Sequence, residues 1–206
     1  MDDKKEIRAI LFDIGGVMIS DVDPSQRMEV AKAFGVTTSQ AKAALAENNP
    51  LLAKGKITEI DFWNRVSSTL KKGLPDDVEN LWYNIMKRHM RVNKETKALS
   101  KKLRDAGYRT GVLSNTEPSH VRYMKEVNLF DGYDPTIFSC DVGHMKPERE
   151  IFLIALERLG LSPEQVVFTD NVNVYVEASK KAGINAYLFS NAANFEKWLK
   201  AMGLEF

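Results

Sequence analysis

Four polar residues of this chain stand where a sheet would bring them together. Asp13, Ser114 and Asp170 each follow or close a short apolar run typical of a buried strand, and Lys146 precedes a helix predicted to begin at Pro147. Taken singly, each residue is typical of a turn, a helix cap or a solvated loop. The carboxyl ends of parallel strands, however, open onto one crevice, where ligands bind. The four side chains are therefore expected to converge on one site.

Two carboxylates, a hydroxyl and an ammonium group are what phosphoryl transfer through a covalent aspartate needs. One carboxylate attacks phosphorus and divides the reaction into two easier steps. The hydroxyl and the ammonium hold the remaining phosphoryl oxygens and offset the charge that develops on them. The second carboxylate helps to hold Mg²⁺, which screens the repulsion between the attacking anion and an anionic substrate.

The elements that must position these residues alternate between strand and helix from residue 93 onward. Gly107, Gly160 and Gly183 supply helix stop signals. Repeated strand–helix units predict an α/β fold with a Rossmann-like parallel sheet and helices on both faces, formed by residues 1–19 and 92–206. The expected strands are one leading to Asp13 and those at 108–113, 136–140, 165–169 and 185–189, and the expected helices are 93–106, 118–128, 147–159, one that ends at Gly183, and a last one capped by Asn194 that runs to Met202.

Between the first two expected strands, residues 20–91 contain helix patterns alone. Start signals stand at Asp23, Ser39, Thr58 and Pro75. Four amphipathic helices without a strand among them predict a small helical cap domain inserted after the first strand. The alternative is that these helices cover the sheet directly, which would leave the first strand without a nearby partner in the sequence.

The composition is that of an ordinary globular protein of 206 residues. Hydrophobic residues make up 44% and charged residues 28%, and a formal net charge of +1 favours neither nucleic acid nor a membrane surface as a partner. Cys140 is the only cysteine, so no internal disulfide is expected. The charged N-terminus predicts no signal peptide, and no apolar run approaches the roughly 20 residues of a spanning helix. We expect a cytoplasmic enzyme or binding protein, and no pattern signals an oligomeric state.

The sequence resembles the haloacid dehalogenase (HAD) superfamily over nearly its whole length, including a helical cap between the first two motifs. Its variants of the motifs look most like the branch that holds bacterial sugar-phosphate phosphatases and the phosphatase domain of soluble epoxide hydrolases. The four matching motifs are Phe12-Asp13-Ile14-Gly15-Gly16-Val17, Leu113-Ser114-Asn115-Thr116, His144-Met145-Lys146-Pro147-Glu148 and Val167-Phe168-Thr169-Asp170-Asn171.

The resemblance assigns a role to each motif. It implies that Asp13 is the nucleophile and that Ser114 and Lys146 grip the phosphoryl group, with Lys146 also part of the catalytic set. Asn115 is expected to contribute to substrate binding within the second motif. The implied cofactor is Mg²⁺, with ligands from Asp13, from Asp170 and from the backbone carbonyl of Gly15.

Three positions depart from the pattern of the family's phosphatases. Gly15 stands where these enzymes usually carry a second Asp as general acid and base. Asn171 replaces the second acid of the fourth motif, and Tyr175 replaces a further Asp or Asn. Because Mg²⁺ often takes only one or two protein carboxylates, Asp13 and Asp170 could suffice. General acid–base help contributes about 10²–10⁴-fold, so we expect slow turnover. Four nearby residues could stand in for the missing acid, although none has a spacing that singles it out: Asp21, Asp23, Thr116 and His120.

The leading hypothesis is a Mg²⁺-dependent phosphatase that acts on a small phosphorylated metabolite through a phosphorylated Asp13. One alternative is a metal-independent haloacid dehalogenase-type hydrolase, in which the aspartate attacks carbon; Asp170 argues against it, because a buried carboxylate beside the nucleophile favours a cation between them. A second alternative is a non-catalytic protein that binds phosphate ligands or a partner protein. Substrate choice is expected from the cap, where the aromatic residues either face the site or pack the cap's own core: Phe62, Trp63, Trp82 and Tyr83.

Overall fold

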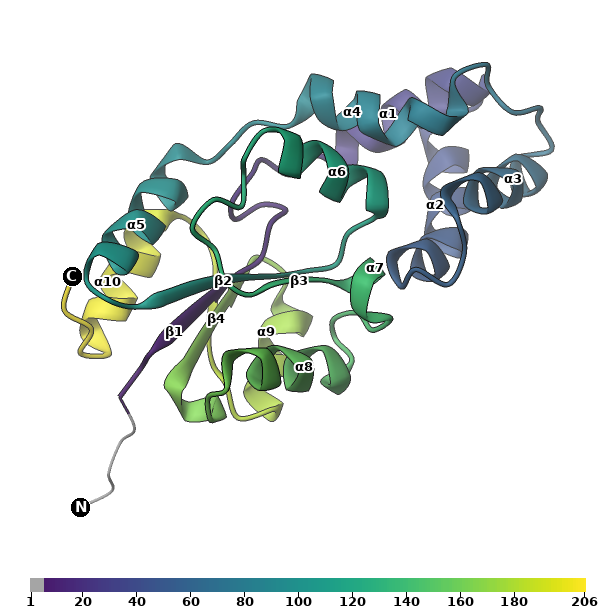
Figure 1. Ribbon diagram of the computed structural model, residues 1–206. Helices are drawn as coiled ribbons and strands as arrows, with labels where there is room; N and C mark the ends of the chain where they lie inside the picture. The colour runs from purple at the N-terminus through teal and green to yellow at the C-terminus, as the bar shows by residue number, and fades with distance from the viewer. Residues whose placement is uncertain (1–5) are drawn as a thin grey trace.

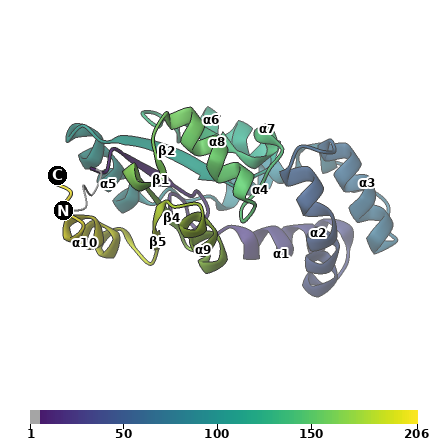
Figure 2. The same cartoon turned by 90° about the horizontal axis from the view of Figure 1, so that it is seen from below.

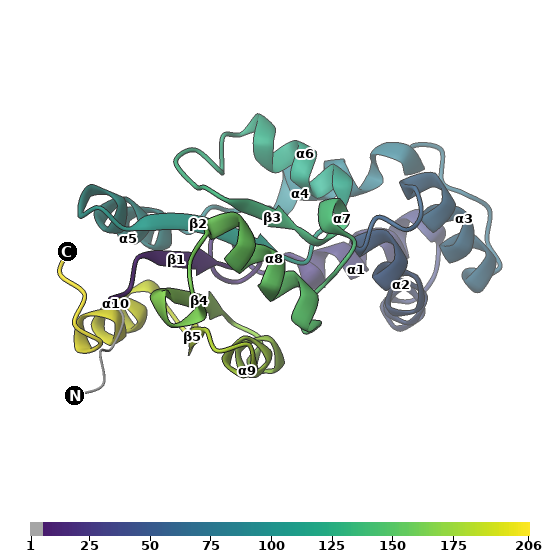
Figure 3. The same cartoon turned by 60° about the horizontal axis from the view of Figure 1, so that its bottom comes forward.

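A five-stranded parallel sheet forms the centre of the computed structural model, which describes residues 6–206. Its strands are β1 (Ala9–Phe12), β2 (Arg109–Ser114), β3 (Thr136–Phe138), β4 (Val166–Asp170) and β5 (Asn185–Leu188). The order across the sheet is β3-β2-β1-β4-β5, so β1 lies in the middle (Figures 1 and 3). In register, Ala9 of β1 lies opposite Arg109 of β2 and Val166 of β4. The predicted α/β fold with a parallel sheet is confirmed.

The two faces of the sheet carry separate hydrophobic clusters because successive side chains of a strand point to opposite sides. Ile10 and Phe12 of β1 join one cluster, whereas Ala9 and Leu11 join the other. The first face is covered by α5 (Lys94–Asp105), α6 (Pro118–Glu126) and α10 (Ala192–Ala201), and the second by α8 (Arg149–Leu159) and α9 (Asn173–Lys181). Helices therefore lie on both faces, as predicted (Figure 2). Within residues 6–206, no helix combines the length and the apolar character needed to cross a membrane.

The helical segment between β1 and β2 begins with four helices that pack on one another. They are α1 (Asp23–Phe34), α2 (Thr38–Ala53), α3 (Glu59–Leu70) and α4 (Leu81–His89), and a 3₁₀ turn, η1 (Val78–Asn80), precedes α4. These helices share a hydrophobic cluster distinct from those on the sheet, and they extend beyond the C-terminal ends of the strands (Figure 2). Phe62, Trp63 and Trp82 are buried in this cluster, which supports packing rather than direct contact with the site as their role.

The chain changes direction across the sheet beside β1. From β1 it passes through β2 to β3 on one side, and then crosses to β4 and β5 on the other. The neighbouring strands β1 and β4 therefore flank the switch point at which open α/β sheets bind ligands. Asp13 directly follows β1, its backbone N–H donates to the Thr169 carbonyl at 3.0 Å, and Asp170 is the last residue of β4. Two of the predicted site residues thus lie side by side.

Two helix caps differ from the expectation. Helix α2 is capped by Thr37, two residues before Ser39, because Thr37 and Gln40 satisfy each other's backbone N–H groups in a capping box. Helix α10 is capped by Asn191, whose side chain accepts the backbone N–H of Asn194. The sequence patterns located both helices but misplaced their first residues.

Two further boundaries also differ. The strand expected at 136–140 ends at Phe138, and the chain turns into the short helix α7 (Ser139–Val142). The Ser139 hydroxyl accepts the backbone N–H of Thr116 at 3.0 Å, which ties this position to the loop after β2 instead of extending the strand. The helix expected from Pro75 starts with η1 at Val78, and another 3₁₀ turn, η2 (Pro163–Gln165), precedes β4.

Candidate active site

Lys146 joins the two predicted carboxylates at the switch point. Its ammonium nitrogen, Nζ, lies 2.6 Å from Asp13 Oδ1 and 2.6 Å from Asp170 Oδ2. A third hydrogen bond, of 3.2 Å, runs from Nζ to the backbone carbonyl of Leu113 in β2. Because an ammonium group has three hydrogens, these acceptors use its full donor capacity and fix its position between three neighbouring strands.

The Asp13–Lys146–Asp170 cluster places three ionisable groups almost entirely out of contact with water. Lys146 is 1% exposed, Asp170 0% and Asp13 7%. Burial alone lowers the pKa of Lys146, but the charges and hydrogen bonds of the two carboxylates outweigh it and hold that pKa above its usual value. Burial is also the main cause that raises the pKa of Asp170; Lys146 opposes this rise and the charge of Asp13 adds to it. With both carboxylates ionised and only one ammonium present, the cluster has a net negative charge. A further cation would therefore stabilise the cluster.

Asn115 holds Lys146 from the backbone side. Its side-chain Nδ2 donates to the Lys146 carbonyl at 2.9 Å, and its Oδ1 accepts the Lys146 N–H at 2.8 Å. The amide thereby links the second motif to the third through two residues that are 31 positions apart. This geometry makes Asn115 a positioning residue for Lys146, whereas its predicted contact with substrate stays a prediction.

Ser114 ends β2 with a buried side chain that makes only a weak hydrogen bond. It is 2% exposed, and its Oγ lies 3.4 Å from the backbone carbonyl of Asn115. A hydroxyl in such a contact retains most of its capacity to donate to a ligand oxygen. Its place beside the cluster suits the predicted grip on a phosphoryl group.

Tyr175 occupies the space beside the ammonium where the family pattern has a smaller polar residue. Lys146 Nζ lies 5.1 Å from the centre of the Tyr175 ring and 5.2 Å from that of Phe168. Aromatic faces at this distance attract a cation. The substitution at 175 therefore stabilises the lysine without adding an acid to the site.

The two glycines after β1 have different structural roles. Gly16 has a φ of +75°, and a Cβ at this position would lie 2.3 Å from the side-chain nitrogen of Asn171. The absence of a Cβ at Gly16 therefore allows the side-chain amide of Asn171, in the fourth motif, to lie against the backbone of the first motif. A Cβ on Gly15 would meet no atom within 4 Å. The carboxylate that the family usually has at 15 would therefore find open space here.

The oxygens present at the site fit a Mg²⁺ ion. Asp13 Oδ2 and the Gly15 carbonyl receive no hydrogen bond from the described residues 6–206, and Asp170 Oδ1 accepts one, of 2.8 Å, from the Val172 N–H. Hard oxygen ligands of this kind suit Mg²⁺, which commonly takes one or two carboxylates together with water and substrate phosphate. The side-chain amide of Asn171 supplies no further negative charge. The set is therefore a minimal one.

A pocket of about 140 Å³ opens beside the second motif, between the sheet and the cap helices. Gly15, Ser114 and Asn115 line it from the sheet, and Gln26 and Asn49 line it from α1 and α2. All four residues that the sequence offered as substitutes for the missing acid also line it: Asp21, Asp23, Thr116 and His120. The sequence did not single out Gln26, Asn49 or Glu117.

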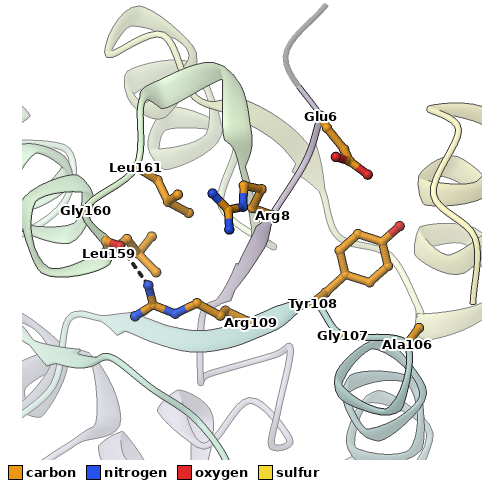
Figure 4. A pocket seen from close by; sticks show the side chains of 9 residues that line it. All are labelled: Glu6, Arg8, Ala106, Gly107, Tyr108, Arg109, Leu159, Gly160 and Leu161. Carbon is orange, nitrogen blue, oxygen red and sulfur yellow. Dashed lines mark hydrogen bonds between the residues drawn. The ribbon is translucent and has the colours of Figure 1, made fainter.

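A larger cavity, of about 420 Å³, lies at the other end of the sheet, by the N-terminal ends of β1 and β2 (Figure 4). Arg8 and Arg109 line it near the C-terminal ends of α5 and α8. Arg109 donates to the Leu159 carbonyl at 2.7 Å, so its charge offsets the partial negative charge of a helix end. None of the four motif residues lines this cavity, and its size does not make it the candidate site.

The fold and site together define an α/β protein with a charged, buried centre at its switch point and a polar pocket under an inserted helical segment. The chain belongs to the haloacid dehalogenase-like hydrolase family, which it matches over residues 7–183. The family predicted from the four motifs is thereby confirmed.

Individual relatives are distant. A phosphorylated carbohydrates phosphatase of Thermotoga maritima is 25% identical over 86% of this chain and 82% of its own length. Rat bifunctional epoxide hydrolase 2 is 23% identical over 97% of this chain, and the chain spans only about 40% of that protein. Other curated relatives are also matched over about 40% of their length. The structure of a HAD family enzyme of Bacteroides thetaiotaomicron with magnesium and inorganic phosphate superposes with a TM-score of 0.73 at 24% identity, over 90% of this chain and 95% of that one, which shows the shared fold.

Proposed function

We propose that this protein is a Mg²⁺-dependent phosphatase of small phosphorylated metabolites that works through a phosphorylated Asp13. In this proposal residues 1–19 and 92–206 form the core domain, and residues 20–91 form a cap domain that selects the substrate. The observation that carries it is the buried cluster in which Lys146 lies 2.6 Å from both Asp13 and Asp170. The names of relatives, a phosphorylated carbohydrates phosphatase among them, support a phosphate ester as substrate.

The geometry suits an in-line attack on phosphorus by Asp13. Its Oδ1 is held by Lys146, which leaves Oδ2 to form the bond. Ser114 and Lys146 are placed to hold the phosphoryl oxygens and to stabilise the charge that develops on them. A Mg²⁺ ion held by Asp13, Asp170 and the Gly15 carbonyl would screen the repulsion between nucleophile and phosphate. Water then releases phosphate from the aspartate, which regenerates the carboxylate.

The metal-independent dehalogenase alternative meets a specific obstacle. It requires no cation beside the nucleophile, yet Asp170 is fully buried next to Asp13 and the single ammonium of Lys146 is shared between them. A surplus buried carboxylate is costly unless a further cation or a proton offsets it. The cluster therefore favours the phosphatase over the dehalogenase.

The test is a panel of sugar, polyol and carboxylic acid phosphates, with 2-chloropropionate as the dehalogenase substrate, assayed with Mg²⁺ and after chelation. We expect phosphate release that requires Mg²⁺ and no chloride release. Chelation is expected to lower kcat/KM by at least about 10²-fold, because several kcal/mol of charge stabilisation are lost. Chloride release that survives chelation would support the dehalogenase. A protein that hydrolyses none of the panel but is thermally stabilised by vanadate and Mg²⁺ would show the non-catalytic alternative to be correct.

A further inference from the structure

A hydrogen-bonded chain of three side chains crosses the boundary between the sheet and the cap at the start of α6. Glu117 Oε2 lies 2.7 Å from His120 Nδ1, and His120 Nε2 lies 3.3 Å from Gln26 Nε2 of α1. The side chains of His120 and Glu117 are 7% and 13% exposed. The ring of Trp82 packs edge-on against the imidazole, with 5.3 Å between the ring centres. The histidine is thus held firmly on both sides.

The partners define how this imidazole handles protons. A carboxylate at Nδ1 accepts a hydrogen, so Nδ1–H donates to Glu117. With the amide as oriented, Gln26 donates to Nε2, which leaves Nε2 as the proton acceptor of a neutral ring. A rotated amide would present its oxygen to Nε2–H, so Gln26 can accompany either protonation state. A histidine oriented by a carboxylate in this way is the arrangement of a general acid and base.

The hydrogen-bonded side chains of Glu117 and His120 lie in the pocket that a carboxylate at position 15 would face. His120 and Glu117 line the 140 Å³ pocket together with Gly15 and Ser114. A side chain on Gly15 would enter open space. Asn49 Oδ1, a buried acceptor, also belongs to a residue that lines this pocket and has no hydrogen-bond partner among the described residues.

We infer that His120, oriented by Glu117, is the general acid and base that replaces the aspartate absent at Gly15. The inference rests on the proposed phosphatase function and deepens it. The step begins with the imidazole protonated on both nitrogens, with Nδ1–H on Glu117 and Nε2–H free to donate. As Asp13 bonds to phosphorus, the ester P–O bond breaks, its electron pair stays on the leaving oxygen, and His120 Nε2 gives that oxygen its proton, which leaves the ring neutral. Water then attacks phosphorus, its proton passes to Nε2, and the bond between phosphorus and Asp13 breaks. Glu117 is a positioning residue, and the leaving group is an alkoxide, which needs a proton to depart.

The test compares two kinds of leaving group in His120→Asn, whose amide can still donate to Glu117. We expect kcat/KM to fall about 10²-fold or more with the polyol or sugar phosphate that the parent hydrolyses fastest. With p-nitrophenyl phosphate, whose phenolate leaves without a proton, the loss should be at least ten-fold smaller. Glu117→Gln should show the same dependence on leaving group at smaller amplitude. His89→Asn is the matched control, because His89 also pairs with a glutamate, Glu29 at 2.9 Å, but does not line the pocket.

Rescue separates an acid–base role from a structural one. Adding Gly15→Asp to His120→Asn places a carboxylate in the open space, and we expect it to restore at least ten-fold of the lost activity on the alkyl phosphate. Equal losses on both kinds of substrate, or no rescue, would overturn the role of His120 while the proposed function stands. A parent that releases no phosphate from any ester overturns the proposed function and this inference together.

Discussion

Asp13→Asn is expected to lower Mg²⁺-dependent phosphate release by at least about 10⁴-fold, the scale on which loss of a covalent nucleophile is felt. The amide nitrogen and oxygen of asparagine keep the volume of the aspartate but cannot form the phosphorylated intermediate. The variant also removes one of the two charges that face Lys146 at 2.6 Å. Steady-state phosphate release with the best substrate of the panel measures the effect.

A stability measurement and a surface variant separate lost chemistry from lost folding. Asp13→Asn leaves one carboxylate, Asp170, against one ammonium, so the cluster keeps a balanced ion pair and the variant should fold. Asp131→Asn is the matched control, since Asp131 is exposed, and its activity should stay within two-fold of the parent. Phosphate release by folded Asp13→Asn at the parent's rate would remove Asp13 from the mechanism.

Lys146→Met is expected to destabilise the fold by about 3–5 kcal/mol and to abolish activity, because it leaves two buried carboxylates without their counter-charge. Methionine keeps a similar length and apolar stem, so the loss reports the ammonium group. Urea unfolding at neutral pH measures the stability change. Lys181→Met on the exposed side of α9 is the control, with an expected change within about 0.5 kcal/mol.

The difference in free energy of unfolding between the parent and Lys146→Met should shrink in alkaline solution. The pKa of Lys146 is raised in the folded state, so the folded chain keeps a proton that the unfolded chain loses at about pH 10.4. The folded state then binds more protons than the unfolded state, and the free energy of unfolding falls as pH rises from about 10.4 through the raised folded-state pKa. This contribution is fully present below that window and absent in Lys146→Met. A stability gap between the two proteins that stays constant as pH rises from 9 to 11.5 would contradict the raised pKa.

The central part of the fold and site was predictable because parallel sheets place chemistry by rule. An apolar run ending at a polar residue marks a buried strand and its carboxyl end, and those ends meet at the switch point. That reasoning alone gathers Asp13, Ser114 and Asp170 at one crevice, whereas the adjacency of the strands that carry Asp13 and Asp170 is a finding of the structure. Lys146 has no strand of its own and was placed with these residues because it precedes a predicted helix start; its role came from the motif resemblance.

The interactions that hold the site lay beyond sequence reasoning because they join distant segments. The Asn115 amide contacts the backbone of Lys146 across 31 residues, and Gln26 reaches His120 across 94. Neither spacing has a periodicity that a sequence pattern could detect. One local signal was present: Glu117 precedes a helix and stands three residues before His120, a spacing that allows side chains on a helix to pair.

The predicted first residues of two helices were wrong for a related reason. Ser39 and Asn194 are good capping residues, but an equally good candidate stands two or three residues earlier in each case, and the capping hydrogen bonds are made by Thr37 and Asn191. The strand predicted through Cys140 ended early because the hydroxyl of Ser139 bonds to the loop after β2. Local preference could not decide among these alternatives, whereas tertiary contacts did.

A covalent bond between Asp13 and phosphorus is the central step of the proposed mechanism. The direct measurement is rapid acid quenching of the enzyme during turnover of its best phosphate ester with Mg²⁺, followed by mass spectrometry of the peptides. A phosphate adduct on the peptide that carries Asp13, formed fast enough for turnover and absent from Asp13→Asn, is the predicted result. Turnover with the adduct on another residue, or a pre-steady-state release of phosphate with no enzyme adduct at any quench time, would contradict it.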